Sequence, residues 1–226
     1  ETVLGAPDPK DAPLIPRGRI ENPMHFFPGL PFNVCGWLIA PLPLADAMLD
    51  IAGLAQRTVQ LHLPRSDVGR DYPRYPDAAA AGFLVADCRV DEPAREIEIV
   101  LSARMKDGGE VTLSALVPRA ADPAEIAMLI REHPACTACA LGTMVSEAAE
   151  RGAWAEADLL AEAAITCHPD SLPLRLAVAR AAERAAASGE WDMVPALARW
   201  QEVMQMVPDD ITAPAGTLRC LLQGGM

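Results

Sequence analysis

The sequence is poor in the features that place a chain in a membrane or on nucleic acid. No window reaches the roughly 18 uninterrupted apolar residues of a membrane-spanning helix. The chain also does not open with a basic segment followed by an apolar core, the pattern of a secretory signal peptide. Only 19 Lys and Arg stand against 31 Asp and Glu, which gives a net charge of −12, and no basic stripe is present. We therefore expect no membrane insertion and neither nucleic acid nor an anionic membrane as a partner.

Signatures of catalysis and cofactor binding are also missing. The chain has no Gly-x-Gly-x-x-Gly or Walker-type loop for nucleotides and no Gly-x-Ser-x-Gly turn for a serine nucleophile. The acidic pairs Asp91-Glu92 and Asp209-Asp210 fall in expected turns or helix ends, where carboxylates are solvated. We therefore predict no catalytic residue and no cofactor. Because the first residue is Glu rather than Met, we expect a piece of a longer protein, whose catalytic domain could lie elsewhere.

The residues that are present predict a folded, two-domain protein of the α+β class. Apolar residues make up 51% of the chain and charged residues 22%, a balance that offsets chain entropy by burial. A length of 226 residues allows two modest cores. We expect a Pro-rich arm at 1–19, an antiparallel β-sandwich at 20–119, a helical domain at 122–210 and a tail at 211–226.

The β half consists of short apolar runs separated by turn residues. In one run Val59, Leu61 and Leu63 alternate with polar neighbours, the period of a half-buried strand. The segment Lys106 to Gly109 has the composition of a hairpin turn. Strands without intervening helices predict a small antiparallel sandwich. The expected strands are 32–40, 47–51, 57–63, 82–90, 96–104 and 110–117.

The helical half begins at Asp122-Pro123, a plausible N-cap followed by Pro in the first turn. Downstream, Ala, Leu, Glu and Arg dominate, and apolar residues recur at spacings of three and four. This pattern is typical of amphipathic helices. The expected helices are 123–133, 137–151, 153–167, 172–188 and 191–206.

A repeat runs through this helical half. Gly152-x-Trp154 precedes Pro169-Asp170, and Gly189-x-Trp191 precedes Pro208-Asp209, with offsets of 37 residues at Gly and Trp and 39 at Pro. With Ala157 and Ala164, the first copy resembles the tetratricopeptide repeat, a pair of antiparallel helices; the second copy has Val194 in place of the small Ala. The resemblance implies stacked hairpins whose inner faces dock a protein partner. We expect the tryptophans Trp154, Trp191 and Trp200 to fill the hairpin cores.

A second resemblance covers about residues 20–119. It rests on Gly36-Trp37, the string Leu63-Pro64-Arg65-x-Asp67-Val68, Tyr72-Pro73 and Gly82-Phe83. Together these resemble a small β-sandwich accessory domain of bacterial glycosyltransferases and methyltransferases of surface-polysaccharide assembly.

Two interpretations of the long connection in this domain are open. In one, Arg65 and Asp67 pair with each other or with backbone, and the tyrosines pack on the sheet beside a buried Trp37. In the other, aromatic faces and polar groups form a shallow glycan-binding surface. The candidate glycan-binding residues are Arg65, Asp67, Tyr72, Tyr75 and Asp77.

Six cysteines are too few for a disulfide scaffold and favour a cytoplasmic setting. His133, Cys136 and Cys139 have ligand-like spacing, and Cys167-His168 lies at the other end of the first expected hairpin. Cys136, Cys139, Cys167 and His168 are therefore an alternative zinc site. We favour cysteines packed as small hydrophobes among the alanines, and predict no metal.

The leading hypothesis is a non-catalytic binding and scaffold module of a bacterial polysaccharide-associated protein. In it the β-sandwich binds glycan or a neighbouring domain, and the helical repeats dock a protein partner. One alternative is the accessory region of a glycosyltransferase or methyltransferase. A third is a structural subunit of an assembly.

Overall fold

In a computed structural model, the described residues are 13–52, 56–190, 192–209 and 211–223. They form a mixed α+β fold with two antiparallel sheets and seven α-helices, as the sequence predicts at this level. Contacts divide the chain into two compact units. The β-unit comprises Glu1–His25, Phe32–Cys88 and Pro93–Arg119, and the helical unit comprises Phe26–Pro31, Arg89–Glu92 and Ala120–Met226.

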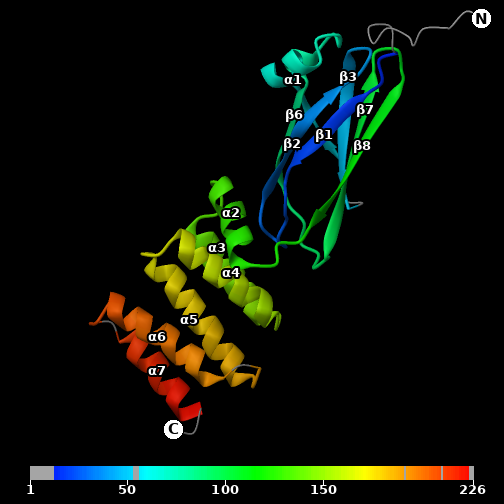
Figure 1. The fold of residues 1–226 in the computed structure, drawn as a ribbon. Coiled ribbons are helices and arrows are strands. Elements are labelled where there is room, and N and C mark those ends of the chain that lie inside the picture. Colours follow the sequence, from blue (N-terminus) through cyan, green and yellow to red (C-terminus); the bar gives the residue numbers. More distant parts are fainter. Residues whose placement is uncertain (1–12, 53–55, 191, 210, 224–226) are drawn as a thin grey trace, which may run out of the picture. The chain divides into compact units, whose positions relative to one another are not determined.

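The β-unit contains two four-stranded sheets, which lie face to face in Figure 1. One sheet has the strand order β1-β2-β6-β5 and the other β4-β3-β7-β8, and every pairing is antiparallel. The strands are β1 (Arg17–Asn22), β2 (Phe32–Ile39), β3 (Leu44–Ile51), β4 (Arg57–Thr58), β5 (Gln60–Leu63), β6 (Gly82–Cys88), β7 (Glu96–Met105) and β8 (Glu110–Pro118).

The hairpin of β7 and β8 follows the sequence pattern closely. Ile97, Ile99 and Leu101 are buried, whereas Glu96 and Glu98 on the same strand are exposed. This alternation places one face of β7 in the core. The predicted turn between the two strands is confirmed, and it contains Gly108 at a φ of 90°, a conformation that favours glycine.

Three expectations for this half need correction. The run 57–63 is two strands, not one: β4 pairs with β3 and β5 pairs with β6, because the chain passes between the sheets at the buried Val59. β1 extends into the expected arm 1–19 and pairs with β2. The long connection after β5 contains the short helix α1 (Ser66–Asp71) and a 3-10 turn (Ala78–Ala80).

The helical unit begins at the predicted cap. The Asp122 side chain accepts hydrogen bonds from the backbone N–H groups of Ala124 and Glu125, and Pro123 occupies the first turn. Six helices follow in this unit. They are α2 (Pro123–Glu132), α3 (Ala138–Glu150), α4 (Trp154–Cys167), α5 (Leu172–Ala187), α6 (Met193–Met206) and α7 (Thr212–Gln223).

The last of these helices was not expected. Residues 211–226 were predicted as a tail, but α7 occupies most of that segment. Ala213, Gly216 and Cys220 recur at helical spacing and are buried on the face toward α6, which stabilises the helix by tertiary packing.

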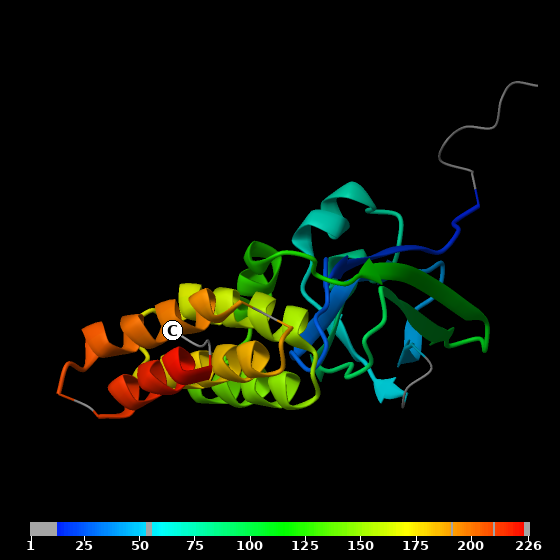
Figure 2. The same ribbon diagram turned by 90° about the horizontal axis from the view of Figure 1, so that it is seen from below.

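From α3 onward the helices form hairpins that lie in two layers, and α2 packs on α4. α3 packs on α4 and α5 packs on α6, while α3 also contacts α5 and α5 contacts α7. Figure 2 shows α3, α5 and α7 in one layer and α4 and α6 in the other. Gly152 and Gly189 follow α3 and α5 with φ angles of 74° and 80°, so both predicted glycine turns are confirmed. No described helix combines the length and apolarity that crossing a membrane requires.

α7 is fastened to the other helices around Trp200. This tryptophan is fully buried, as expected, and its Nε1 donates to the carboxylate of Glu183 on α5 at 3.1 Å. Arg219 of α7 donates to the same carboxylate at 2.6 and 3.0 Å. Gly216 lies so close that a Cβ at this position would be 2.3 Å from the indole ring. The absence of a side chain at Gly216 therefore sets the distance between α6 and α7.

We predict opposite effects for two glycine-to-alanine substitutions inside helices. Gly216→Ala forces the indole of Trp200 to move and should lower the free energy of unfolding by about 1–3 kcal/mol. Gly142→Ala on α3 meets its neighbours at 3.4 Å or more and should raise it by about 0.5–1 kcal/mol through the better helix propensity of alanine. Urea unfolding of both variants measures the difference, and equal unfolding free energies would contradict the tight contact at Trp200.

Candidate functional site

Arg65 is the centre of an ion-pair cluster at the start of the long connection in the β-unit. Its Nε and Nη2 donate to the Asp67 carboxylate at 2.9 and 2.7 Å. Its Nη1 and Nη2 donate to the Glu21 carboxylate at 2.8 and 3.1 Å. Most donors of the guanidinium are thus used within the β-unit, and Arg65 joins α1 to β1.

The two tyrosines of this connection pack against the sheet. Tyr75 is 8% exposed and its hydroxyl donates to the carbonyl of Ile15 at 2.7 Å. Tyr72 is half-buried, and its ring centroid lies 5.5 Å from that of Trp37, with the guanidinium of Arg17 5.8 Å from its centre. Trp37 itself is half-buried beside Tyr72 rather than enclosed.

The five candidate glycan-binding residues are therefore only partly brought together. Arg65 and Asp67 bond each other, and Tyr72 and Tyr75 meet edge to face with centroids 6.2 Å apart. Asp77 lines a separate small hollow of about 10 Å³ with His62 and Leu61. The contacts of Arg65, Asp67 and Tyr75 are those of the first interpretation, in which these side chains bond and pack within the domain. Of the two tyrosines, Tyr72 keeps part of its ring accessible.

The Arg65 cluster sets the protonation of Asp67. Its hydrogen bonds to Arg65 hold the pKa of the Asp67 carboxyl well below its ordinary value. A lowered pKa contributes stability that is present above the ordinary carboxyl pKa and is lost as the pH falls through the native value.

We predict that Arg65→Ala returns the Asp67 pKa toward the ordinary value of about 3.9. Carbon-detected NMR titration of the carboxyl groups measures this change. Arg70→Ala is the matched control, because Arg70 pairs with Asp71 and the variant should leave the titration of Asp67 unchanged. An unaltered Asp67 pKa in Arg65→Ala would contradict the assignment.

The alternative zinc ligands do not form a coordination site. Nε2 of His168 donates to the backbone carbonyl of Cys136 at 3.0 Å, and the Cys167 thiol contacts the Ala127 carbonyl at 3.6 Å. Burial raises the pKa of the Cys136 thiol, which disfavours the thiolate that zinc needs, and Cys139 is exposed. Among the described residues no cluster of three or more His, Cys, Asp or Glu is placed to hold a metal ion.

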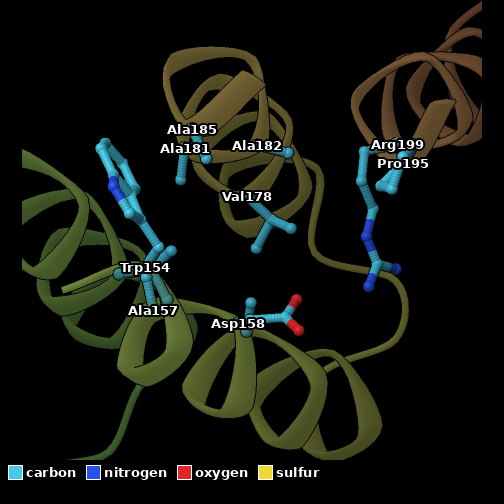
Figure 3. A pocket seen from close by; sticks show the side chains of 11 residues that line it. Trp154, Ala157, Asp158, Val178, Ala181, Ala182, Ala185, Pro195 and Arg199 are labelled. Carbon is cyan, nitrogen blue, oxygen red and sulfur yellow. The ribbon is translucent and has the colours of Figure 1, made fainter. Parts of the chain in front are cut away.

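A groove with a cavity volume of about 50 Å³ lies between α4 and α6, with α5 as its floor (Figure 3). The groove forms because α4 and α6 both contact α5, while the α5 side chains that face the space between them are small. Alanines at helical spacing on α4 and α5 leave space where larger side chains would fill it. The lining residues are Val145, Trp154, Ala157, Asp158, Ala161, Val178, Ala181, Ala182, Ala185, Pro195 and Arg199.

Two charged side chains face this apolar groove from opposite walls. Asp158 extends from α4 and Arg199 from α6, and Figure 3 shows both directed into the space between the helices. The Asp158 carboxylate has no hydrogen bond among the described residues. Within the described part of the chain, Arg199 donates one long hydrogen bond, of 3.5 Å, to Glu202. Both groups are accessible to an incoming ligand, since each is half-buried.

The environment of Asp158 disfavours its charge. Burial raises the pKa of its carboxyl, Glu162 raises it further, and Arg199 opposes both effects. A half-buried carboxylate of this kind gains most from a donor that arrives with a ligand, because such a donor replaces lost hydration.

The sequence did not identify this groove. Trp154 was expected in a hairpin core; it packs against the core of the helical unit but is only half-buried, and its ring also lines one end of the groove. Trp200 is buried as expected, and Trp191 lies outside the described residues. Asp158 and Arg199 are 41 positions apart, and no motif links them. The sequence signal that could have identified the groove is Asp158, a charged residue among alanines on an otherwise apolar helix face.

Comparisons with known proteins give no relative. No family model matches the chain, and neither a curated protein nor a solved structure is similar to it.

We predict that Asp158→Asn makes the protein more stable at about pH 7, because it removes a carboxylate whose charged form the native state disfavours. A raised native pKa contributes stability that is present at low pH and is lost as the pH rises through the native value. The advantage of the variant should therefore shrink as the pH falls to about 4. Thermal unfolding across this range measures it, with the exposed Asp170→Asn as the control. A constant difference at all pH values would contradict the assignment.

Proposed function

We propose that this chain is a non-catalytic binding and scaffold module whose helical unit docks a segment of a partner protein in the groove between α4 and α6. In this proposal the two sheets form a β-sandwich and the helices form a stack of hairpins of the tetratricopeptide-repeat type. The hairpins α3–α4 and α5–α6, with glycine at each turn and proline after α4 and α6, support the second part.

The observation that carries the proposal is the combination of an alanine floor with Asp158 and Arg199 on opposite walls. A peptide has the matching chemistry: apolar side chains for the floor, N–H donors or a basic side chain for Asp158, and carbonyls or an acidic side chain for Arg199. The cavity volume of about 50 Å³ suits a small apolar side chain of an extended segment rather than a folded domain.

Charge favours a basic residue at the Asp158 end. Residues 120–226 contain 15 acidic and 7 basic side chains, so the helical unit attracts cationic segments at long range. We therefore commit to a partner segment with small or medium apolar residues next to Lys or Arg.

A second depression, of about 430 Å³, lies over α3 and α5, the faces that the repeat resemblance favours. Thr143, Ser146, Glu147 and Glu150 line it, and Glu150 is already paired with Arg184 at 2.9 Å. Four of its nine lining residues are polar or charged, against two of the eleven that line the groove, so we place the partner in the groove instead.

Other parts of the hypothesis stay predictions. These are glycan binding by the β-unit, an origin in a polysaccharide-associated protein, and the alternatives of an accessory region of a glycosyltransferase or methyltransferase and of a structural assembly subunit.

Selection of random peptides by display on the whole chain tests the proposal. Enriched peptides should combine apolar residues with Lys or Arg. Asp158→Asn, which keeps the shape of the side chain, should weaken their binding about 10- to 100-fold, as expected for loss of a charged hydrogen bond worth about 1.5–3 kcal/mol.

Asp170→Asn is the matched control, since Asp170 is exposed and lies outside the groove. It should leave the dissociation constant unchanged in calorimetry. Peptides that bind Asp158→Asn, Arg199→Ala and the wild type equally well would place the docking surface elsewhere and end the proposal.

A further inference from the structure

A cavity of about 430 Å³ lies within the helical unit, apart from the groove between α4 and α6. It is lined by residues of α3 and α4 and by residues of the segments 26–31 and 89–92, which belong to the same unit. Sites for small molecules usually have volumes of about 300–1,000 Å³. The cavity is therefore large enough for a small metabolite.

The two non-helical segments that line this cavity are held in place by buried residues. Phe27 and Leu30 belong to the core of the helical unit, and Val90 is also buried. The backbone N–H of Gly29 donates to the carbonyl of Val90 at 2.9 Å, which joins the two segments. A Cβ on Gly29 would lie 3.1 Å from the Met144 Cε, so glycine at this position lets the segment approach α3 closely. The wall of the cavity is thus formed by the fold before any ligand binds.

Three charged side chains in the cavity are not used by the fold. Arg89, Asp91 and Glu147 are exposed there, and none of them forms a hydrogen bond or ion pair with another described residue. Arg151, by contrast, donates to the carboxylate of Glu156 at 3.2 Å. One guanidinium and two carboxylates therefore remain for a ligand.

These charges match a ligand that carries both signs. A guanidinium binds a carboxylate through two parallel N–H donors, and an ammonium group has three donors, enough to bond both Asp91 and Glu147. A simple anion would instead meet two uncompensated carboxylates. Pro28, Met144 and Leu160 add apolar surface to the lining. A carboxylate, an ammonium group and an apolar side chain together are the features of an amino acid.

We propose that this cavity binds a free amino acid with an apolar side chain, whose carboxylate contacts Arg89 and whose ammonium group contacts Glu147 and Asp91. No residue that lines the cavity also lines the groove between α4 and α6. Amino acid binding is thus independent of the proposed peptide docking, and either proposal can fail alone.

Titration calorimetry of the whole chain with leucine, methionine and valine tests the site. At least one of the three should bind at millimolar concentration or below. Arg89→Met and Glu147→Gln should each weaken this binding about 10- to 100-fold, because each removes a charged hydrogen bond. Absence of binding by all three amino acids would overturn the proposal, as would a dissociation constant that either substitution leaves unchanged.

Arg180→Met and Glu132→Gln are the matched controls, because both side chains are exposed in the same unit and lie outside the cavity. All four variants should retain the helical circular dichroism signal, since the substituted side chains are exposed. The two controls should keep the dissociation constant of the wild type. A control that weakens binding as much as the matching cavity variant would assign the effect to the net charge of the unit and end the proposal.

Altered ligands test the roles of the two charged groups. The amide of the bound amino acid lacks the carboxylate, so Arg89→Met should not weaken its already reduced binding further. The N-acetyl derivative lacks the ammonium group, and the same should hold for Glu147→Gln. Such pairs measure the coupling between one group of the ligand and one group of the protein. A substitution that weakens the altered ligand as much as the amino acid itself would overturn the contact proposed for that residue.

Discussion

The close approach of helices over alanine and glycine is the constraint on which the helical unit depends. Trp200 fills a slot that Gly216 leaves open, and the carboxylate of Glu183 binds both the indole of Trp200 and the guanidinium of Arg219. Three helices are therefore held by one aromatic ring and one carboxylate. Large apolar side chains are few in this unit, and most other contacts between helices are made by alanine. These small side chains leave space between the helices that a ligand can occupy.

The groove follows from the same constraint. α4 and α6 both pack on α5. Because the side chains of α5 between them are mostly alanines, a channel remains between α4 and α6. Asp158 and Arg199 sit on its walls, where partial burial raises the pKa of the carboxyl and makes a complementary donor valuable. On α7, by contrast, apolar side chains are exposed on the face opposite the buried Ala213, Gly216 and Cys220.

The β-unit is organised by a different type of interaction. Alternating side chains bury one face of β2 and β7, and the long connection after β5 is held by ion pairs and by the tyrosines rather than by sheet hydrogen bonds. Arg65 links α1 to β1 through Asp67 and Glu21. This use of polar residues explains why a segment with the composition of a binding loop can be internally satisfied.

The sequence by itself determined the α+β class, most strands and helices, the hairpin turn at Gly108 and the glycine turns at Gly152 and Gly189, because these depend on local periodicity and backbone conformation. Only the tertiary structure decided that 57–63 divides between two sheets, that 212–223 is a helix and that Trp154 lines a groove. Asp158 and Arg199 lie on opposite walls of that groove because α5 holds their helices at a fixed spacing. Such spacing depends on contacts between distant residues, which no local pattern specifies.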